Sequence, residues 1–303
     1  MSPGTVVLGD EPWVVLGGGG LKGLGHIGAW RAIQERGLEP AGVVGTSIGA
    51  LVGVCVGSGM EWKELEELAR ALEREDIVRV RRRAVWINGV KSSSLYQGEA
   101  LREYLESILP IDDWSELHFP VQVNAVDLGT GETEWFGTGA RTDVSPLDVV
   151  LASASLPVLY PPVQVDDRFL VDGGVGDALP LGRAADLGAT GIVGVDVGST
   201  RIADAGATVE RGMVAIHQRV FSLMAGRRRR ATVEGWTDPP LVFVRPRLAG
   251  YSGFEFDAVS YFLDEGYRAA SEALTESSEA TGTGIPGPEP GERAPDEKGG
   301  SSS

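Results

Sequence analysis

Short β-branched runs alternate with helical patterns in the first part of the chain. "WVVLG" (13–17) is followed by "HIGAWRAIQERG" (26–37), and "AGVVG" (41–45) is followed by "IGALVGVCVG" (48–57). Apolar runs of this length are typical of strands that are buried on both faces, and the segments after them have the spacing of crossover helices. The alternation predicts an α/β fold in which helices pack on the faces of a parallel sheet.

Helical spacing dominates the next stretch. Apolar residues recur at helical intervals from Glu61 to Glu75, and "LYQGEALREYLESIL" (95–109) repeats the pattern. We therefore expect a helical excursion from the sheet over about residues 60–115. Such an excursion can serve as a lid over a site at the edge of the sheet.

The remaining elements follow from turn and cap signals. "VQVNAVDLGTGETEWFG" (121–137) indicates two strands joined by a glycine-rich turn. "SPLDVVLASA" (145–154) indicates a short helix with Ser145 as its N-cap and Pro146 at its first position. Three more strands are expected in "RFLVDGG" (168–174), "TGIVGVDVG" (190–198) and "PLVFVRP" (240–246).

Composition divides the chain into three parts. Residues 1–12 form an N-terminal extension, residues 13–275 one folded domain, and residues 276–303 a tail. The tail is rich in Gly, Pro, Ser and Glu and has a single bulky aliphatic residue, Ile285, so it buries too little to fold and is expected to be disordered.

Cysteine usage and the N-terminus bear on the compartment. Cys55 is the only cysteine, so an internal disulfide is excluded and a reducing environment is favoured. The N-terminus lacks a basic region followed by an apolar core and a small-residue cleavage site, so the sequence predicts a cytoplasmic protein. Residues 41–60 are apolar enough to suggest a membrane span, but their six glycines fit a buried strand followed by a buried helix.

Charge limits the binding partners. The formal net charge is −16, which argues against nucleic acid because a phosphate backbone needs a basic surface. Two arginine runs stand out, Arg79 with Arg81–Arg83 and Arg227–Arg230. Each run could contact an anionic membrane surface, although a solvated helix end is the simpler interpretation. Oligomeric state stays open.

The first candidate for chemistry is Ser47 in "GTSIG" (45–49). The pentapeptide follows an apolar run and opens a segment of small and aliphatic residues, which is the strand–turn–helix setting of a nucleophile elbow. Gly45 and Gly49 allow the sharp turn. This geometry would hold the serine oxygen clear of the sheet and near a helix N-terminus, which favours a developing anion.

A glycine-rich loop, "GGGGLKGLG" (17–25), follows the first strand. Successive glycines can turn their amides into one concavity that binds a phosphate or an acyl oxyanion. Gly18, Gly20 and Gly23 also satisfy the spacing of a dinucleotide-binding fingerprint. That alternative requires an acidic residue at the end of the next strand, where this chain has Gly45-Thr46-Ser47 instead.

A serine nucleophile needs a base. His26 is interpreted as a packed or capping residue, His118 has nothing around it to mark a site, and His217 lies among apolar residues of a helix although its place in the chain fits a Ser–Asp–His order. Asp172 ends a predicted strand and precedes two glycines, Gly173 and Gly174, where a sheet presents catalytic groups.

Several motifs together resemble a known family. "GGGLKG" (18–23), "GTSIG" (45–49) and "DGG" (172–174) are similar, in this order, to the oxyanion loop, nucleophile elbow and catalytic aspartate motif of the patatin-like phospholipases. Support comes from "ASASLPVLYPPV" (152–163), "SLYQGEALREYLESIL" (94–109) and "VGVDVG" (193–198). The resemblance covers roughly residues 13–275.

The resemblance implies a three-layer α/β/α fold and a serine hydrolase of lipid or other acyl esters. It makes Ser47 the nucleophile and Asp172 its base in a dyad without histidine, and it implies neither a metal nor a cofactor. It assigns oxyanion stabilisation to Gly18, Gly19 and Gly20, with Lys22 at the position where the family usually has Arg or Lys.

One departure from the family pattern concerns Ala178, since members often have Asn after the aspartate in the segment that here reads Asp177-Ala178-Leu179-Pro180. The missing amide predicts a looser turn beneath Asp172, and Asp177 is interpreted as a surface residue. Two alternatives therefore stay open beside the hydrolase: a catalytically weak protein that binds lipid or a protein partner, and a dinucleotide-binding domain.

Overall fold

A computed structural model of the chain describes residues 8–80, 92–198 and 205–279. Within these ranges eight strands form one sheet in the order β5-β6-β3-β2-β1-β7-β8, and β4 also pairs with β3. Five strands are mutually parallel and three are antiparallel to their neighbours. The parallel strands are β1 (Pro12–Leu16), β2 (Gly42–Gly45), β3 (Val121–Asp127), β7 (Gly191–Val195) and β8 (Leu241–Val244); the antiparallel ones are β4 (Thr133–Gly137), β5 (Val163–Val165) and β6 (Arg168–Asp172).

The pairing of β3 explains how distant segments meet. Val123 pairs with Gly45 of β2, and Ala125 pairs with Asp172 of β6. Both residues also pair with β4, which occupies the other edge of β3. Strands β2 and β6 therefore lie on the same edge of β3, one after the other. Because β2 is parallel to β3 and β6 is antiparallel, their C-terminal ends point toward each other.

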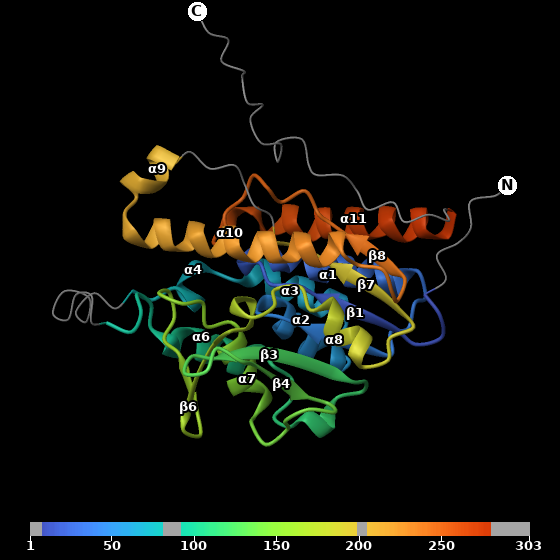
Figure 1. The fold of residues 1–303 in the computed structure, drawn as a ribbon, viewed down its shortest axis with the longest axis horizontal. Coiled ribbons are helices and arrows are strands. Elements are labelled where there is room, and N and C mark those ends of the chain that lie inside the picture. Colours follow the sequence, from blue (N-terminus) through green and yellow to red (C-terminus); the bar gives the residue numbers. More distant parts are fainter. Residues whose placement is uncertain (1–7, 81–91, 199–204, 280–303) are drawn as a thin grey trace, which may run out of the picture.

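Helices cover both faces of the sheet (Figure 1), in layers of different thickness. One face packs against the larger set: α1 (Gly25–Glu35), α2 (Ile48–Gly57), α3 (Trp62–Ala71), α6 (Gly98–Ile108), α7 (Pro146–Ser153) and α11 (Val259–Glu279). The other face packs against α8 (Leu181–Asp186) and the C-terminal end of α10 (Met213–Glu234). Alternate residues of β1, such as Val14 and Val15, enter the two cores. The predicted three-layer α/β fold with a mostly parallel sheet is confirmed.

The remaining elements are short. They are α4 (Arg74–Ile77), α9 (Ala205–Glu210) and the 3₁₀ turns η1 (Gly20–Leu24), η3 (Trp114–Glu116), η4 (Gly173–Val175) and η5 (Phe256–Ala258). Helices α3, α4 and α6 form the predicted excursion. Residues 81–91, with Arg81–Arg83, lie outside the described residues.

The cap and turn residues in the sequence correctly predicted several boundaries of helices and strands. The hydroxyl of Ser145 accepts a hydrogen bond from the Asp148 amide (3.1 Å), so Ser145 caps α7, and Pro146 is its first residue. Strands β3 and β4 form the expected hairpin. Helix α11 continues to Glu279, so the first four residues of the expected tail, 276–279, are helical. The other tail residues, 280–303, lie outside the described residues.

Candidate active site

Ser47 stands on a tight turn between β2 and α2. Its φ of 57° is positive, which is rare for a residue with a side chain and is typical of a nucleophile elbow. A Cβ at Gly45 would collide with the Gly49 carbonyl oxygen, and a Cβ at Gly49 would collide with the Leu16 carbonyl oxygen. The two glycines of the pentapeptide are therefore required by close backbone approach.

Asp172 lies directly across from Ser47, at the end of β6. The Ser47 hydroxyl donates a hydrogen bond to Asp172 Oδ2 (2.9 Å), and the Gly174 amide donates to Asp172 Oδ1 (2.7 Å). Both side chains are almost completely buried. The two residues are 125 positions apart in the sequence and meet because β2 and β6 end at the same point on β3.

Burial changes the acidity of Asp172. Desolvation raises the pKa of its carboxyl from 3.8 to about 7, although the hydrogen bonds from the Gly174 amide and the Ser47 hydroxyl lower it. A carboxylate with a pKa near neutrality can accept a proton at neutral pH and return it later. This is the property required of a base that works without histidine.

One short segment holds both residues in place. Ser153 Oγ accepts a hydrogen bond from the Ser47 amide (2.9 Å), and the Ser155 carbonyl oxygen accepts one from the Asp172 amide (3.0 Å). From the sequence, this segment contributed only to the family resemblance, and no role was predicted for Ser153. Its signal was the pair of serines at the end of a short apolar helix.

The turn after Asp172 is supported from β3. Asn124 Nδ2 donates hydrogen bonds to the Asp177 carbonyl oxygen (2.9 Å) and to the Gly173 carbonyl oxygen (3.3 Å). A Cβ at Gly173 would collide with the Asn124 side chain. Asn124 thus provides the amide that we expected to be missing at Ala178, and the turn is held from a different strand.

Asp177 corrects one expectation. It was interpreted as a surface residue, but its side chain is half-buried and accepts a hydrogen bond from the Leu179 amide (3.0 Å). Its carbonyl oxygen also accepts one from the Thr46 hydroxyl (3.1 Å). Asp177 therefore ties the turn after Asp172 to the residue before Ser47.

The glycine-rich loop lies beside the elbow, but its amides are not equivalent. The Gly18 amide donates to the Ala178 carbonyl oxygen (2.9 Å), so this amide is already engaged, which corrects the expectation that Gly18 is an oxyanion donor. Within the described residues no acceptor is found for the amides of Gly19 and Gly20. The Ile48 amide, at the first position of α2, is similarly without a partner there and was not considered from the sequence.

Lys22 lies near a buried pair of charged side chains, Asp196 and Arg229. Its side chain is buried and does not line the cavity described below. Burial and the charge of Arg229 lower the pKa of Lys22 to about 8, while the charge of Asp196 raises it. Arg229 of α10 forms an ion pair with Asp196 (3.1 Å) at the end of β7. The larger of the two charge effects on Lys22 is therefore the repulsion by Arg229.

The histidines are not engaged with the serine. His26 Nε2 donates to the Gly17 carbonyl oxygen (2.7 Å), and burial lowers the pKa of His26 to about 4, so it is a neutral packed residue, as expected. Among the described residues, which include all three histidines, no hydrogen bond joins His26, His118 or His217 to Ser47.

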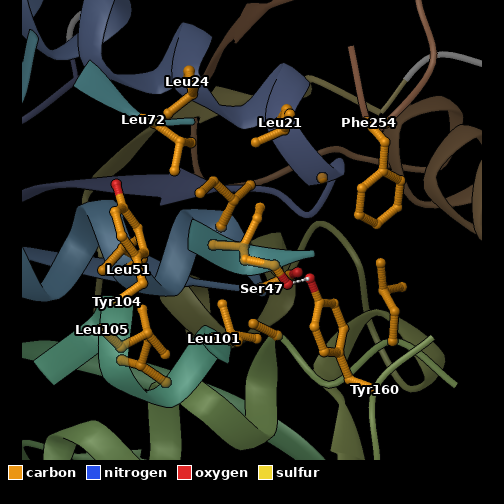
Figure 2. A pocket seen from close by; sticks show the side chains of 17 residues that line it. Leu21, Leu24, Ser47, Leu51, Leu72, Leu101, Tyr104, Leu105, Tyr160 and Phe254 are labelled. Atoms are coloured by element: carbon orange, nitrogen blue, oxygen red, sulfur yellow. Dashed lines mark hydrogen bonds between the residues drawn. The ribbon is translucent and has the colours of Figure 1, made fainter. Parts of the chain in front are cut away.

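An apolar cavity opens beside Ser47 (Figure 2). The empty space in and around it is about 660 Å³, part of which is open solvent, and its walls come from the elbow, the glycine loop, the helical excursion and α7. Ser47 contributes a hydroxyl to it, whereas the Tyr160 hydroxyl donates to the Ile77 carbonyl oxygen (2.8 Å). Other lining residues are Leu21, Leu24, Ile48, Leu51, Leu72, Leu101, Tyr104, Leu105, Val150, Ala154, Leu156 and Phe254.

Among the described aromatic residues of the excursion, one lines the cavity. Tyr104 lines the wall, whereas the Trp114 indole is buried elsewhere and donates to the Val144 carbonyl oxygen (2.8 Å). Trp62 packs under the Arg31 guanidinium. Trp86 lies outside the described residues.

Two kinds of feature are absent from the described ranges. No helix in them has the length and hydropathy needed to cross a membrane. No group of three or more His, Cys, Asp or Glu side chains in them has a metal-binding arrangement.

The fold and this constellation define a hydrolase-like α/β protein with a serine elbow opposite a buried aspartate. The family model of the patatin-like phospholipases matches residues 14–185, which is more than half of the chain. The chain belongs to the patatin-like phospholipase family.

Relatives with sequence similarity extend this result. Over 222 residues the chain is 31% identical to the uncharacterized NTE family protein Rv1063c of Mycobacterium tuberculosis, an alignment that covers 71% of this chain and 58% of that protein. Over 190 residues it is 29% identical to lysophospholipase NTE1 of Mycosarcoma maydis, covering 61% of this chain and 10% of that protein. The chain thus spans less than two thirds of the length of these relatives.

Among solved structures, VipD from Legionella pneumophila aligns with 88% of this chain and 67% of its own, at 16% identity and a TM-score of 0.48. A likeness at this level carries no information about activity.

Proposed function

We propose that this protein is a serine acyl-ester hydrolase that acts on lipids, of the phospholipase or lysophospholipase type. The hydrogen bond of 2.9 Å between Ser47 Oγ and Asp172 Oδ2, beside an apolar cavity, is the observation that carries the proposal. Family membership and the similarity to a lysophospholipase support the same reaction class.

The proposed reaction has two halves. Ser47 Oγ attacks the ester carbonyl carbon while its proton passes to Asp172, and the amides of Gly19, Gly20 and Ile48 stabilise the oxyanion. The leaving alcohol takes the proton from Asp172, which leaves an acyl group on Ser47. Water then attacks the carbonyl carbon of the acyl-enzyme and transfers a proton to Asp172. As the tetrahedral intermediate collapses, Asp172 returns this proton to Ser47 Oγ, and the carboxylic acid departs. No metal or cofactor takes part in this mechanism.

The cavity supports an acyl chain as the bound part of the substrate. Its walls are built almost entirely from leucine, isoleucine, valine and aromatic side chains. Such a lining gains free energy by removing methylene groups from water, at about 0.8 kcal/mol for each buried CH₂. A polar ester would gain little from the same walls.

The proposal includes a location at a lipid surface. Long-chain lipids are held in membranes, so the enzyme is proposed to contact a membrane peripherally, from the cytoplasmic side. Cys55 is a free thiol buried in the core, which agrees with a reducing compartment.

Covalent labelling tests the nucleophile. A fluorophosphonate probe is expected to modify Ser47 in the native protein, to leave Ser47→Ala unlabelled and to label Asp172→Asn much more slowly, with the site identified by mass spectrometry of the peptides. Hydrolysis of a short soluble ester by the same three proteins gives the matching activity. A folded native protein that takes no label and hydrolyses no ester would refute the proposal and favour a lipid-binding role for this family member.

A further inference from the structure

The outward face of α10 carries an apolar stripe without a partner in the described structure. Met213 and Met224 are 71% and 66% exposed, well above what a core-facing helix shows. The full stripe is Met213, Ile216, Val220, Leu223 and Met224, with Val209 exposed on the adjacent α9. These positions recur every three or four residues, so they share one face of the helix.

The same helix is strongly basic within an acidic protein. Its 22 residues include five arginines and a single acidic residue, Glu234, whereas the whole chain has a formal net charge of −16. Arg227 lies on the same face of the helix, one turn beyond Leu223. It is exposed, as is Arg228 beside it. The outward face is therefore apolar in its first half and cationic in its second.

The inward face of α10 rests on the candidate active site. Gln218 Nε2 donates to the Pro157 carbonyl oxygen (3.4 Å), and the Phe221 ring lies against Gly174, close enough that a methyl group there would be in van der Waals contact (3.7 Å). Gly174 in turn donates to Asp172. In Figure 1 the helix runs along the upper part of the molecule, with α9 at its outer end.

We propose that the outward face of α10 is the surface with which this protein docks on an anionic lipid membrane. Methionine, isoleucine, valine and leucine side chains enter the boundary of the acyl chains, and the exposed Arg227 and Arg228 contact the anionic headgroups. This inference rests on the proposed function, because docking brings the membrane to within about one helix diameter, roughly 10 Å, of the turn that carries Asp172.

Charge argues against a second copy of the chain as the occupant of this face. Met213, Ile216, Val220 and Leu223 have the spacing of a coiled-coil seam, but Arg227 follows on the same seam. A parallel pair of helices would place the two Arg227 side chains against each other. An antiparallel pair would place each of them against apolar side chains of its partner. A membrane instead offers acyl chains and anionic headgroups in adjacent layers.

Vesicle flotation tests the docking. The full chain carrying Ser47→Ala is incubated with vesicles of phosphatidylcholine alone or with phosphatidylglycerol, so binding is measured without turnover. Binding is expected only to the anionic vesicles and is expected to weaken with added salt. Val220→Glu/Met224→Glu should reduce the partition coefficient at least tenfold. Leu128→Glu/Phe169→Glu is the matched control, since it places the same charges on exposed apolar residues of another surface.

Three outcomes would overturn the inference: no binding to anionic vesicles, equal losses in the α10 variant and the control, or a native dimer that Val220→Glu/Met224→Glu converts to a monomer in light scattering. Unchanged circular dichroism in both variants keeps the comparison valid. Hydrolysis of a soluble ester by the native protein is measured separately. Its absence would refute the proposed function, whereas lost docking with retained hydrolysis would refute only this inference.

Discussion

At the scale of single residues, the candidate site depends on two unfavourable states that the surrounding structure sustains. Ser47 has a backbone conformation that side chains rarely adopt, and Asp172 is an acid buried away from water. Each would cost free energy in isolation. Hydrogen bonds from Gly174 and Ser47 offset part of the cost at Asp172.

The pH dependence of hydrolysis follows from Asp172. Burial raises its pKa to about 7, and only the ionised carboxylate can accept the Ser47 proton. We expect kcat/KM for a short soluble ester to rise tenfold per pH unit below about 7 and to level off above it. A pH–rate profile measures this directly. If kcat/KM instead reached half of its maximum near pH 4, Asp172 would not be desolvated in the working enzyme.

The same burial affects stability. Because the pKa of Asp172 is higher in the folded state than the ordinary 3.8, the folded protein holds its proton more tightly, and stability is lost as pH rises from about 4 to about 7. Asp172→Asn removes this loss, so the variant should gain up to about 4 kcal/mol relative to the native protein at pH 8 and little at pH 4. Urea unfolding at several pH values measures the difference, and a gain independent of pH would contradict the cause.

Replacement of His217 distinguishes a Ser–Asp dyad from a triad that uses histidine. His217→Ala should leave hydrolysis within about threefold of the native rate, whereas Asp172→Asn should lower it by several orders of magnitude. Steady-state kinetics on one soluble ester compare the two variants. The opposite pattern would indicate a base that depends on histidine.

At the scale of elements, α7 and β3 each carry a side chain that positions a catalytic residue belonging to another element. Ser153 holds the Ser47 amide, and Asn124 holds the turn after Asp172. Both are buried polar side chains whose hydrogen bonds reach across elements. Such residues affect catalysis by fixing the positions of the reacting side chains.

Ser153→Ala tests this positioning. The change leaves the Ser47 amide without its acceptor, at a cost of about 1–3 kcal/mol, so kcat should fall roughly tenfold to a hundredfold with KM nearly constant. Ser155→Ala is the matched control, because Ser155 binds Asp172 through its main-chain carbonyl and its hydroxyl donates to Leu151. Equal losses in both variants, or a change confined to KM, would argue against a positioning role for Ser153.

At the scale of the whole molecule, the cavity is assembled from segments that share little sequence proximity. Leu51 of α2, Leu101 of α6 and Phe254 near the start of α11 line one space. Its size depends on how the excursion packs against the elbow. Acyl-chain preference is therefore a property of the tertiary structure.

Filling this cavity should change chain-length preference. Leu51→Trp places a larger side chain one helical turn from Ser47, so hydrolysis of dodecanoyl or longer esters should fall at least tenfold relative to a butanoyl ester. Leu128→Trp, at an exposed position outside the cavity, should leave the ratio unchanged. The ratio of kcat/KM values for the two esters is the measurement. An unchanged ratio in Leu51→Trp would indicate that the acyl chain binds elsewhere.

Local patterns in the sequence determined much of this protein. The alternation of strands and helices, the Ser145 cap and the glycines around Ser47 depend on neighbouring residues, whose preferences act over one or two turns. The motifs around Ser47 and Asp172 could therefore be identified, together with the family.

Only the tertiary structure decided which atoms meet. The engagement of Gly18 with Ala178, the support of the Asp172 turn by Asn124 and the burial of Lys22 with Asp196 and Arg229 join segments that are distant in the sequence. Pairing of β2 and β6 along one edge of β3 brings them together. Long-range pairing and desolvation depend on the whole packed chain, and no local pattern encodes either.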